Sequence, residues 1–400
     1  MPPVCPKGVI SDHPRGECEI AGRRYAYELQ VGFETLDGTS PRHAGIRGWA
    51  LDLDSNTPGP ILCVTTETGG TVRFKPDQPR GDALRVMAIP KERHSAAMRC
   101  GFSGIVPDAG SKVTFALEVG DQSVTVATGR PDRPQIIAGW ENWLFLTGDS
   151  NDSPEQFTGD HQPSAAWLSG WDAYFDALRE LSGSGTAGRL CFVIAPSKES
   201  IFPDYYPLAR GPRSPLDSLM ERYGTVPELF YPVSVLSAQR ELSYDRSETH
   251  WTHFGARLVC QEITHRFGKH NAPLPQSFGL SYVAGDLGWK AIPPVRTYRP
   301  IAIWPNGSKV IFDNFVLHHG RIRVTVNPKP QRKQTYVIFG GSSAEHMEHY
   351  LTAIYARVVY VYSAGAPDPA ILAYERPDFT ILQSSERFLI RAPEPEVNNA

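Results

Sequence analysis

The sequence predicts an α/β protein in which a parallel-sheet domain follows a smaller N-terminal β-sandwich domain. Residues 1–133 contain short stretches of alternating apolar residues and no helical periodicity, which indicates β structure. From Gly139 onward, continuous apolar runs alternate with stretches of helical spacing, a pattern typical of the strands and crossover helices of a parallel sheet. A chain of 400 residues also exceeds one ordinary core, so more than one domain is expected.

The charges of the chain are nearly balanced, with 40 Lys and Arg against 43 Asp and Glu and a formal net charge of −3. Such a balance predicts neither a nucleic-acid partner nor steering of a charged substrate. The N-terminus lacks the basic start and apolar run of a secretory signal, and no apolar run is long enough to span a membrane. We therefore expect a chain that is not a membrane protein and that acts in the cytoplasm.

The cysteines are scattered, without a C-x-x-C pair and without metal-like spacing to histidine. They are Cys5, Cys18, Cys63, Cys100, Cys191 and Cys260. Free thiols in a reducing compartment are therefore expected. No metal site and no nucleotide motif is predicted, and His253, His265 and His270 are interpreted as surface residues.

Residues 1–133 are expected to form the β-sandwich. Between Val113 and Val119 every second residue is apolar, and similar strand-like stretches are separated by turns rich in Gly, Pro and Asp. Trp49, in the run GIRGWALDLD, either anchors the core of this sandwich or stacks on a sugar. The core role is the commoner one for a tryptophan on a strand.

Two prolines, Pro131 and Pro134, break regular structure and set the expected domain boundary. The larger domain is expected over residues 134–392. The tail of residues 393–400 is polar and contains proline, so we expect it to be disordered.

Two patterns predict the framework of the larger domain. Trp171, Phe175 and Leu178 recur at helical spacing and predict one apolar helix face. Arg189–Ala195 (RLCFVIA) is a continuous apolar run and predicts a buried parallel strand. Ligands of parallel sheets bind at the carboxyl ends of the strands, so the loops after such strands are where a site is expected.

The first stretch with chemical potential is Asp245–Ala256 (DRSETHWTHFGA). It places Glu248 and His250 two residues apart, just before a helix that Thr252 can cap. An imidazole at a helix entrance can face a cleft, and a carboxylate two residues away can orient it. This is the pairing of a general base with its orienting acid.

The second stretch is Tyr336–Met347 (YVIFGGSSAEHM), which places Ser342 and Ser343 at the end of an apolar strand and before a helix. Backbone N–H groups at such a turn point toward a developing negative charge. Gly340 and Gly341 are the candidates for this backbone role. A hydroxyl, a base and an orienting acid together are the parts of an acyl-transfer site.

Both stretches resemble motifs of the AlgX/AlgJ-like acetyltransferases, SGNH-hydrolase-like proteins that O-acetylate alginate and related bacterial exopolysaccharides. The histidine stretch matches the family block Tyr-x-x-x-Asp-x-His-Trp-x-x-x-Gly-Ala. Further matching stretches, in the same order as in the family, are Gly139–Leu146 (GWENWLFL), Val193–Pro207 (VIAPSKESIFPDYYP), Phe339–Ser343 and Arg376–Leu389 (RPDFTILQSSERFL). The resemblance implies an SGNH-hydrolase-like parallel-sheet domain.

The resemblance also implies the roles of the site residues. Ser342 would be the nucleophile, His250 the base and Glu248 the acid that orients it. This chain has Glu248 where the family has Asp, and Asp245 is the alternative orienting acid. It also has glycine before Ser342, so the neighbouring Ser343 is an alternative nucleophile.

Three further residues have two interpretations each. Ser150, in a literal Gly-Asp-Ser tripeptide, would be the nucleophile if the chain followed the order of classical SGNH hydrolases. Lys198 either neutralises charge near the site or is simply solvated. Trp251 either shapes an acyl or carbohydrate pocket or packs under the helix that follows it.

The function implied is O-acetylation of a bacterial polysaccharide or glycan precursor through an acyl-serine intermediate. A carbohydrate acetylesterase with the same three residues is the first alternative, and an inactive glycan-binding protein is the second. The acyl donor is unknown, and acetyl-CoA is one candidate. A membrane acyl-transfer partner or the polysaccharide synthesis machinery would be the expected partner, and by analogy with the family the location would be periplasmic. The loose resemblance of GIRGWALDLD to a β module of polysaccharide-related proteins suggests carbohydrate docking by the N-terminal domain.

Overall fold

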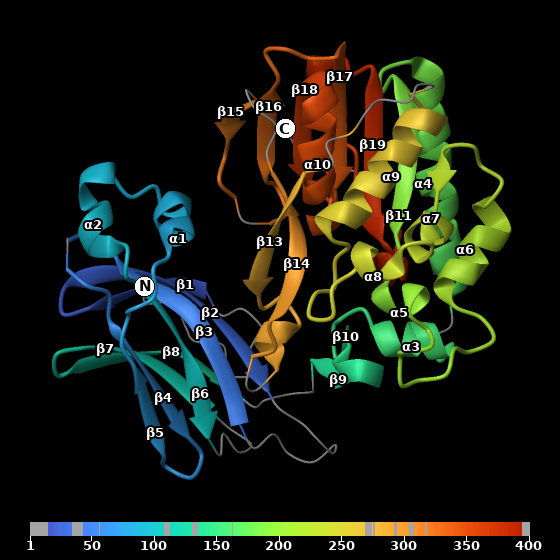
Figure 1. Ribbon diagram of the computed structural model, residues 1–400. Coiled ribbons are helices and arrows are strands. Elements are labelled where there is room, and N and C mark those ends of the chain that lie inside the picture. Colours follow the sequence, from blue (N-terminus) through green and yellow to red (C-terminus); the bar gives the residue numbers. More distant parts are fainter. Residues whose placement is uncertain are drawn as a thin grey trace. The chain divides into compact units, whose positions relative to one another are not determined.

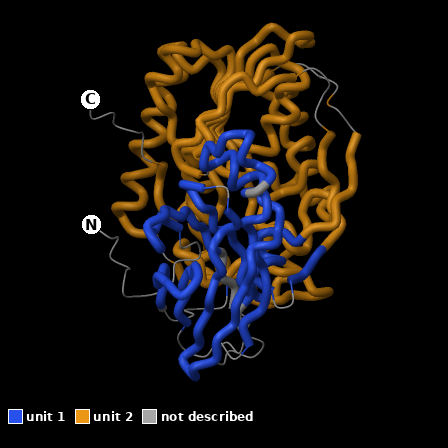
Figure 2. Tube along the Cα trace, turned by 90° about the vertical axis from the view of Figure 1, so that its left-hand side faces the viewer, with its two compact units in different colours: residues 1–137, 284–296 blue, residues 138–283, 297–400 orange. Residues whose placement is uncertain are grey.

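The protein is described by a computed structural model over residues 15–393, except 34–42, 56, 108–112, 130–134, 162, 269–273, 275–276, 292–293, 304–307 and 317. The chain consists of two compact units, one of residues 1–137 with 284–296 and one of residues 138–283 with 297–400 (Figure 2). The sequence placed Ala284–Arg296 in the larger domain, whereas in the structure this segment belongs to the N-terminal unit. The predicted linker prolines, His270 and nearly all of the predicted tail lie outside the described residues.

The N-terminal unit contains two antiparallel four-stranded sheets, in the orders β1-β2-β3-β6 and β5-β4-β7-β8 (Figure 1). The strands are β1 (Arg15–Ile20), β2 (Arg23–Phe33), β3 (His43–Asp52), β4 (Ile61–Thr66), β5 (Thr71–Phe74), β6 (Gly101–Pro107), β7 (Val113–Val119) and β8 (Gln122–Gly129). The short helices are α1 (Gly81–Val86), η1 (Lys91–Arg93), α2 (His94–Ala97) and η3 (Gly288–Lys290). Both sheets contribute to one core, with Leu29 and Phe102 from the first and Leu62 and Phe115 from the second. The alternation read in the sequence between Val113 and Val119 is that of β7, which turns Val113, Phe115 and Leu117 into this core.

Trp49 is a core residue of the N-terminal unit. Its side chain is only 4% exposed and packs in a cluster with Leu51, Leu84 and Ile89. A ring buried to this extent presents no face to a sugar. The carbohydrate-stacking role suggested for Trp49 is therefore wrong, and the core role is correct.

The second unit is built on a seven-stranded sheet in the order β12-β11-β19-β17-β18-β16-β15. The strands from β12 to β18 in this order run parallel, whereas β16 and β15 are antiparallel additions at one edge. The sheet strands are β11 (Arg189–Ala195), β12 (Leu229–Phe230), β15 (Lys309–Asp313), β16 (Ile322–Val326), β17 (Arg332–Gly340), β18 (Tyr355–Tyr362) and β19 (Phe379–Ser385). Two further pairs are β9 (Ile136–Ala138) with β10 (Leu144–Leu146) and β13 (Phe278–Val283) with β14 (Thr297–Ala302). The protein is thus a mixed α/β protein with several sheets.

The helices of the second unit surround this sheet, and α9 and α10 pack side by side (Figure 1). The α-helices are α3 (Ser153–Thr158), α4 (Ala165–Ser184), α5 (Lys198–Ile201), α6 (Pro215–Tyr223), α7 (Val233–Ser237), α8 (Arg240–Ser243), α9 (His253–Arg266), α10 (Ser342–Ile354) and α11 (Pro369–Glu375). Short 3₁₀ turns are η2 (Trp140–Asn142) and η4 (Glu386–Phe388). Within the described ranges, no helix is both long enough and apolar enough to cross a membrane.

Local sequence signals account for the main elements of this unit. Trp171, Phe175 and Leu178 are buried on one face of α4 against the strands, which confirms the predicted helix face. The predicted buried strand is β11, with the same bounds. Thr252 accepts a hydrogen bond from the Gly255 N–H and caps α9 as expected.

The strand-to-helix turn between β17 and α10 depends on glycine. A Cβ atom on Gly340 would lie 2.4 Å from the Ala344 Cβ and 3.1 Å from Gln383 Oε1. Only a residue without a side chain therefore permits the chain to leave the strand and enter the helix within one residue. This turn brings Ser342 to the carboxyl end of a parallel strand, where ligands of such sheets bind.

Candidate active site

Ser342, His250 and Glu248 form a continuous row of hydrogen bonds. Ser342 Oγ lies 2.6 Å from His250 Nε2, and His250 Nδ1 lies 2.5 Å from Glu248 Oε1. A carboxylate can only accept, so Nδ1 carries the proton and Nε2 is left to accept the hydroxyl proton of Ser342. The row has the connections that a serine nucleophile, its base and an orienting acid require.

The second oxygen of Glu248 has a partner that sequence reasoning missed. Arg299 on β14 donates from Nη1 to Glu248 Oε2 at 2.8 Å. The carboxylate is thus held from both sides, by His250 on one oxygen and Arg299 on the other. Nothing in the sequence pairs Arg299 with Glu248, because the two residues are 51 positions apart and the pairing depends on the packing of β14.

The histidine and serine stretches are joined through Trp251. This side chain is 0% exposed, and its Nε1–H donates to the Ser343 carbonyl oxygen at 2.8 Å. The Trp251 carbonyl oxygen in turn accepts from His346 Nδ1 at 3.0 Å. Trp251 therefore fixes the distance between the two stretches. The suggested role of Trp251 in an acyl or carbohydrate pocket is wrong, because its ring is fully buried and has no accessible face.

The backbone amides at the serine turn are not equivalent. The Gly341 N–H donates to the side-chain oxygen of the buried Gln383 at 2.9 Å, and Tyr360 Oη donates to the Gly341 carbonyl oxygen at 2.9 Å. The Gly341 amide proposed as an oxyanion donor is thus already occupied, and Gly340 N lies within β17. Ser342 and Ser343 are the first residues of α10, and no acceptor within the described residues takes their N–H groups. These two amides replace the glycine amides as the candidate oxyanion donors.

The structure places the two alternative nucleophiles, Ser343 and Ser150, in surroundings that differ from those of Ser342. Ser343 is buried beside Ser342, but the imidazole of His250 bonds to the hydroxyl of Ser342. Ser150 is exposed in the turn after β10, and the neighbouring Asp149 accepts hydrogen bonds from Ser153. The structure describes no contact between Ser150 and a histidine.

Asp245, the alternative orienting acid, has a local role. Its Oδ1 accepts from the Ser247 N–H and from Ser247 Oγ, each at 2.8 Å, and Thr297 Oγ1 approaches both carboxylate oxygens at 2.7 Å. The carboxylate shapes the loop before His250 and ties it to β14. The carboxylate that is hydrogen-bonded to His250, and so can orient it, is that of Glu248.

Lys198 is neither solvated nor part of the row. Its side chain is 3% exposed, and Nζ donates to the carbonyl oxygens of Leu144, Asp245 and Arg246 at 2.6, 2.9 and 3.2 Å. The ammonium group therefore joins β10 to the loop that carries the histidine stretch. The interpretation of Lys198 as a solvated residue is wrong, and its role in neutralising charge near the site stays a prediction.

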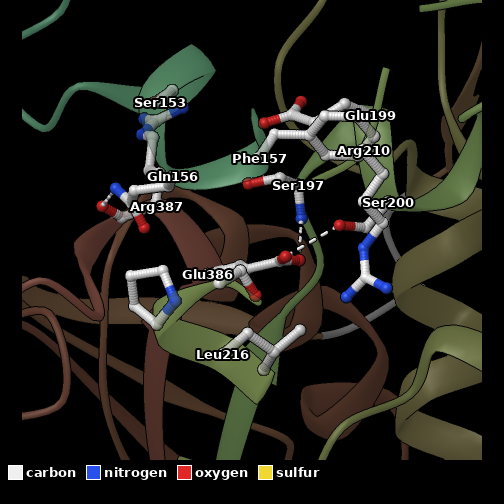
Figure 3. Close-up of a pocket in the computed structure, with 12 residues that line it drawn as sticks. Ser153, Gln156, Phe157, Ser197, Glu199, Ser200, Arg210, Leu216, Glu386 and Arg387 are labelled. Atoms are coloured by element: carbon white, nitrogen blue, oxygen red, sulfur yellow. Dashed lines mark hydrogen bonds between the residues drawn. The ribbon is translucent and has the colours of Figure 1, made fainter. Parts of the chain in front are cut away.

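A pocket adjoins the row and is lined by His250, Ser343, Thr249, Glu199 and Arg387 among others. A second pocket has part of its wall in common with the first (Figure 3). The common wall residues are Ser153, Ser197, Glu199 and Arg387. The pockets lie at the carboxyl ends of β11 and β19, as the parallel-sheet prediction requires.

The buried carboxylate of Glu386 organises this wall. It accepts from the Ser197 N–H at 2.8 Å, from Ser200 Oγ at 2.7 Å and from Tyr231 Oη at 3.0 Å (Figure 3). Burial raises the pKa of Glu386, and the donors of Ser197, Ser200 and Tyr231 oppose that rise. Glu386 thereby fixes the loop between β11 and α5.

Three histidines pack next to the row. The rings of His253 and His346 stack with centroids 4.3 Å apart, and His349 meets His253 edge-on at 5.9 Å. Burial lowers the pKa of His253 to about 3 and those of His346 and His349 to about 4; the second cause is His346 for His253, His250 for His346 and His253 for His349. His253 was expected at the surface, which is wrong because α9 turns it toward α10; His265 is exposed, as expected.

Comparisons with known proteins found distant structural similarities. No family model matches the chain, and no curated protein matches it. PatB1 from Bacillus cereus, solved with a sulfonyl adduct, shares 11% identity over 64% of this chain and 97% of its own, with a TM-score of 0.41. A DHHW family protein from Eubacterium siraeum shares 11% identity over 70% of this chain and 92% of its own, also with a TM-score of 0.41. Similarities at this level assign neither family nor function, so the AlgX/AlgJ-like resemblance stays an expectation.

Proposed function

We propose that the protein is a serine-dependent O-acyltransferase in which Ser342 is the nucleophile, His250 the base and Glu248 the orienting acid. The observation that supports this most directly is the row of hydrogen bonds from Ser342 Oγ through the imidazole to the carboxylate. A hydroxyl bonded to a neutral imidazole that is itself bonded to a carboxylate is the arrangement that makes a serine nucleophilic.

The reaction has two halves. In the first, Ser342 Oγ forms a bond to the acyl carbon of the donor while its proton moves to His250 Nε2. The bond between the acyl carbon and the leaving group then breaks, and the leaving group takes the proton from Nε2. In the second half, His250 takes the proton of an acceptor hydroxyl, whose oxygen bonds to the acyl carbon, and Ser342 Oγ leaves and regains a proton.

Charge develops twice in this sequence. The imidazolium that forms on His250 is stabilised by Glu248, whose position Arg299 fixes. The negative oxygen of each tetrahedral intermediate would face the N–H groups of Ser342 and Ser343 at the start of α10, where the helix dipole also favours it.

For the substrates we propose an acetyl donor and a hydroxyl of a bacterial polysaccharide or glycan precursor as acceptor. The resemblance of the histidine and serine stretches to AlgX/AlgJ-like proteins supports this choice. The same residues would serve a carbohydrate acetylesterase, in which water takes the place of the sugar hydroxyl. An inactive glycan-binding protein has no need for Ser342, His250 and Glu248 to meet, so their row weighs against that alternative.

Mass spectrometry after brief incubation with p-nitrophenyl acetate tests the nucleophile. The expected result is a single acetylated serine at position 342, absent in Ser342→Ala and present in the control variants Ser343→Ala and Ser150→Ala. An adduct on Ser343 or Ser150 would overturn the assignment. If no variant forms an adduct or turns over the ester, the chain is not a serine acyltransferase.

A further inference from the structure

Glu199 and Arg387 face the pocket beside His250 from two neighbouring strands. Glu199 lies in α5, just after β11, and Arg387 lies in η4, just after β19. Since β11 and β19 are parallel neighbours, their carboxyl ends place both residues on the same edge of the sheet. Both residues line the pocket beside His250 and the second pocket as well.

The Glu199 carboxyl group is buried and has no hydrogen-bond donor from another residue of the described chain. The residue is 8% exposed. Figure 3 shows the contrast with Glu386, whose carboxylate receives the hydrogen bonds of Ser197 and Ser200 while none reaches Glu199. Burial raises the pKa of Glu199 to about 7, with the nearby Glu386 as a further cause and the charges of Arg387 and Lys198 opposing the rise.

The side chain of Arg387 likewise has no ion-pair partner among the described residues. Its guanidinium group lies over the Phe388 ring at 5.0 Å. Its backbone carbonyl oxygen, in contrast, accepts from Gln156 Nε2 at 2.7 Å and so fixes the main chain. A buried carboxyl group with no donor from another residue, next to a half-buried guanidinium group without an ion pair, is the kind of arrangement that occurs where a ligand supplies further bonds.

We infer that Glu199 and Arg387 form an acceptor subsite that binds hydroxyl groups of a polyhydroxylated molecule and so places a further hydroxyl at His250. In this subsite Glu199 accepts from one hydroxyl, and Arg387 donates to another hydroxyl oxygen. The inference rests on the proposed acyltransferase function and adds the residues that choose the acceptor.

The charges on the wall favour a neutral, hydroxyl-rich ligand. A second carboxylate, Glu386, is close enough to raise the pKa of Glu199 and disfavours an anion, while Arg387 disfavours a cation. An apolar group would leave the Glu199 carboxyl without a partner. A hydroxyl both donates and accepts, so adjacent sugar hydroxyls can satisfy both residues.

The test measures how the acetyl-enzyme divides its acetyl group between an added acceptor and water. Acetyl-Ser342 is formed from p-nitrophenyl acetate and offered cellotetraose, chitotetraose or propan-1-ol. This division does not depend on how fast the acetyl-enzyme forms. The wild type is expected to transfer to at least one of the oligosaccharides in preference to propan-1-ol.

Glu199→Met keeps the length of the side chain but removes its acceptors, so this preference is expected to fall by about tenfold, the effect of one hydrogen bond. Arg387→Met should act similarly. Glu199→Gln retains a carbonyl oxygen and should restore part of the preference. Glu180→Met, at an exposed position on α4 that lines neither pocket, is the matched control and should resemble the wild type.

An unchanged preference in both methionine variants would overturn the subsite, as would a wild type that does not prefer either oligosaccharide. A lack of acetyl-Ser342 in the wild type would instead overturn the proposed function. In that case cellotetraose is titrated into Ser342→Ala by calorimetry: binding that weakens when Glu199→Met is added supports the subsite, and equal or undetectable binding overturns it.

Discussion

At the scale of single residues, the site depends on groups whose partners come from other elements. Glu248 is bonded by His250 on one oxygen and by Arg299 on the other. Such outer partners fix the orientation of a reactive group, and their loss typically costs about ten- to a hundredfold in activity. Variants of Glu248 therefore separate the role of its charge from the role of its length.

Glu248→Gln should lower the rate of Ser342 acetylation by roughly a thousandfold or more, because an amide neither stabilises the imidazolium nor selects its tautomer. Glu248→Asp should have a smaller effect, since a side chain shorter by one methylene cannot reach His250 and Arg299 together. Arg299→Met should lower the rate by about ten- to a hundredfold. The measurement is the burst of p-nitrophenol from p-nitrophenyl acetate, with the melting temperature of each variant as control. A wild-type burst in Arg299→Met would show that Arg299 has only a structural role.

At the scale of elements, the turn between β17 and α10 decides where Ser342 lies. The backbone makes two consecutive glycines unequal: a Cβ on Gly340 would collide with Ala344, whereas a Cβ on Gly341 meets nothing closer than Gln383 Oε1 at 3.7 Å. Gly341 also has an extended conformation that alanine adopts readily (φ −95, ψ −163).

Gly340→Ala should therefore abolish or strongly reduce acetylation of Ser342 and lower the melting temperature, because the strand or the helix must shift. Gly341→Ala should retain both activity and stability to within a few degrees. The burst assay and thermal unfolding of the two variants side by side provide the check. Equal behaviour of the two would mean that the turn adapts and does not fix the serine.

Elements were predictable from sequence where the signal is local. Residues close in sequence determine three such features: the apolar run of β11, the apolar face of α4 and the Thr252 cap of α9. Ser342, His250 and Glu248 were also selected from local motifs, and in the structure they are bonded in a row, while their catalytic roles stay predictions.

What sequence reasoning missed depends on contacts between distant residues. The side-chain oxygen of Gln383 accepts a hydrogen bond from the Gly341 N–H, although the two residues are 42 positions apart. Lys198 donates to carbonyl groups on two other segments. Neither the burial of Trp251 nor the stacking of His253 on His346 could be read from the sequence, since tryptophan and histidine occur both at surfaces and in interiors. Such partners follow only from the packing of elements against one another.

At the scale of the whole molecule, the buried histidines predict sensitivity to acid. The folded-state pKa values of His253, His346 and His349, about 3, 4 and 4, lie below the ordinary value of 6.5. Between pH 6.5 and these values the unfolded chain binds more protons than the folded chain, so the stability falls as the pH falls. Glu199 and Glu386 act in the opposite direction, because their raised pKa values let the folded chain hold a proton above the ordinary range, up to about pH 7 for Glu199.

Urea denaturation between pH 7 and pH 5 measures this balance. We expect the free energy of unfolding to decrease toward pH 5 in the wild type. In His253→Phe the decrease should be smaller, because the variant lacks one histidine that stays neutral in the folded chain but binds a proton in the unfolded chain. Glu199→Gln should make the decrease steeper. A pH dependence that His253→Phe leaves unchanged would show that these histidines do not control it.

The assignment of Ala284–Arg296 to the N-terminal unit also affects how the protein can be divided. In this segment η3 contacts β2 and β3, and Trp289 lies under the Arg47 guanidinium at 4.3 Å, although the flanking strands β13 and β14 belong to the other unit. A protease site inserted between Ile137 and Ala138 should therefore yield two fragments that still co-elute in gel filtration, because the C-terminal fragment carries part of the N-terminal fold. The N-terminal unit therefore cannot be removed by a single cut in the chain: a truncated protein that starts at Ala138 would expose the buried Leu287. Exchanging this unit between proteins would require both pieces of chain.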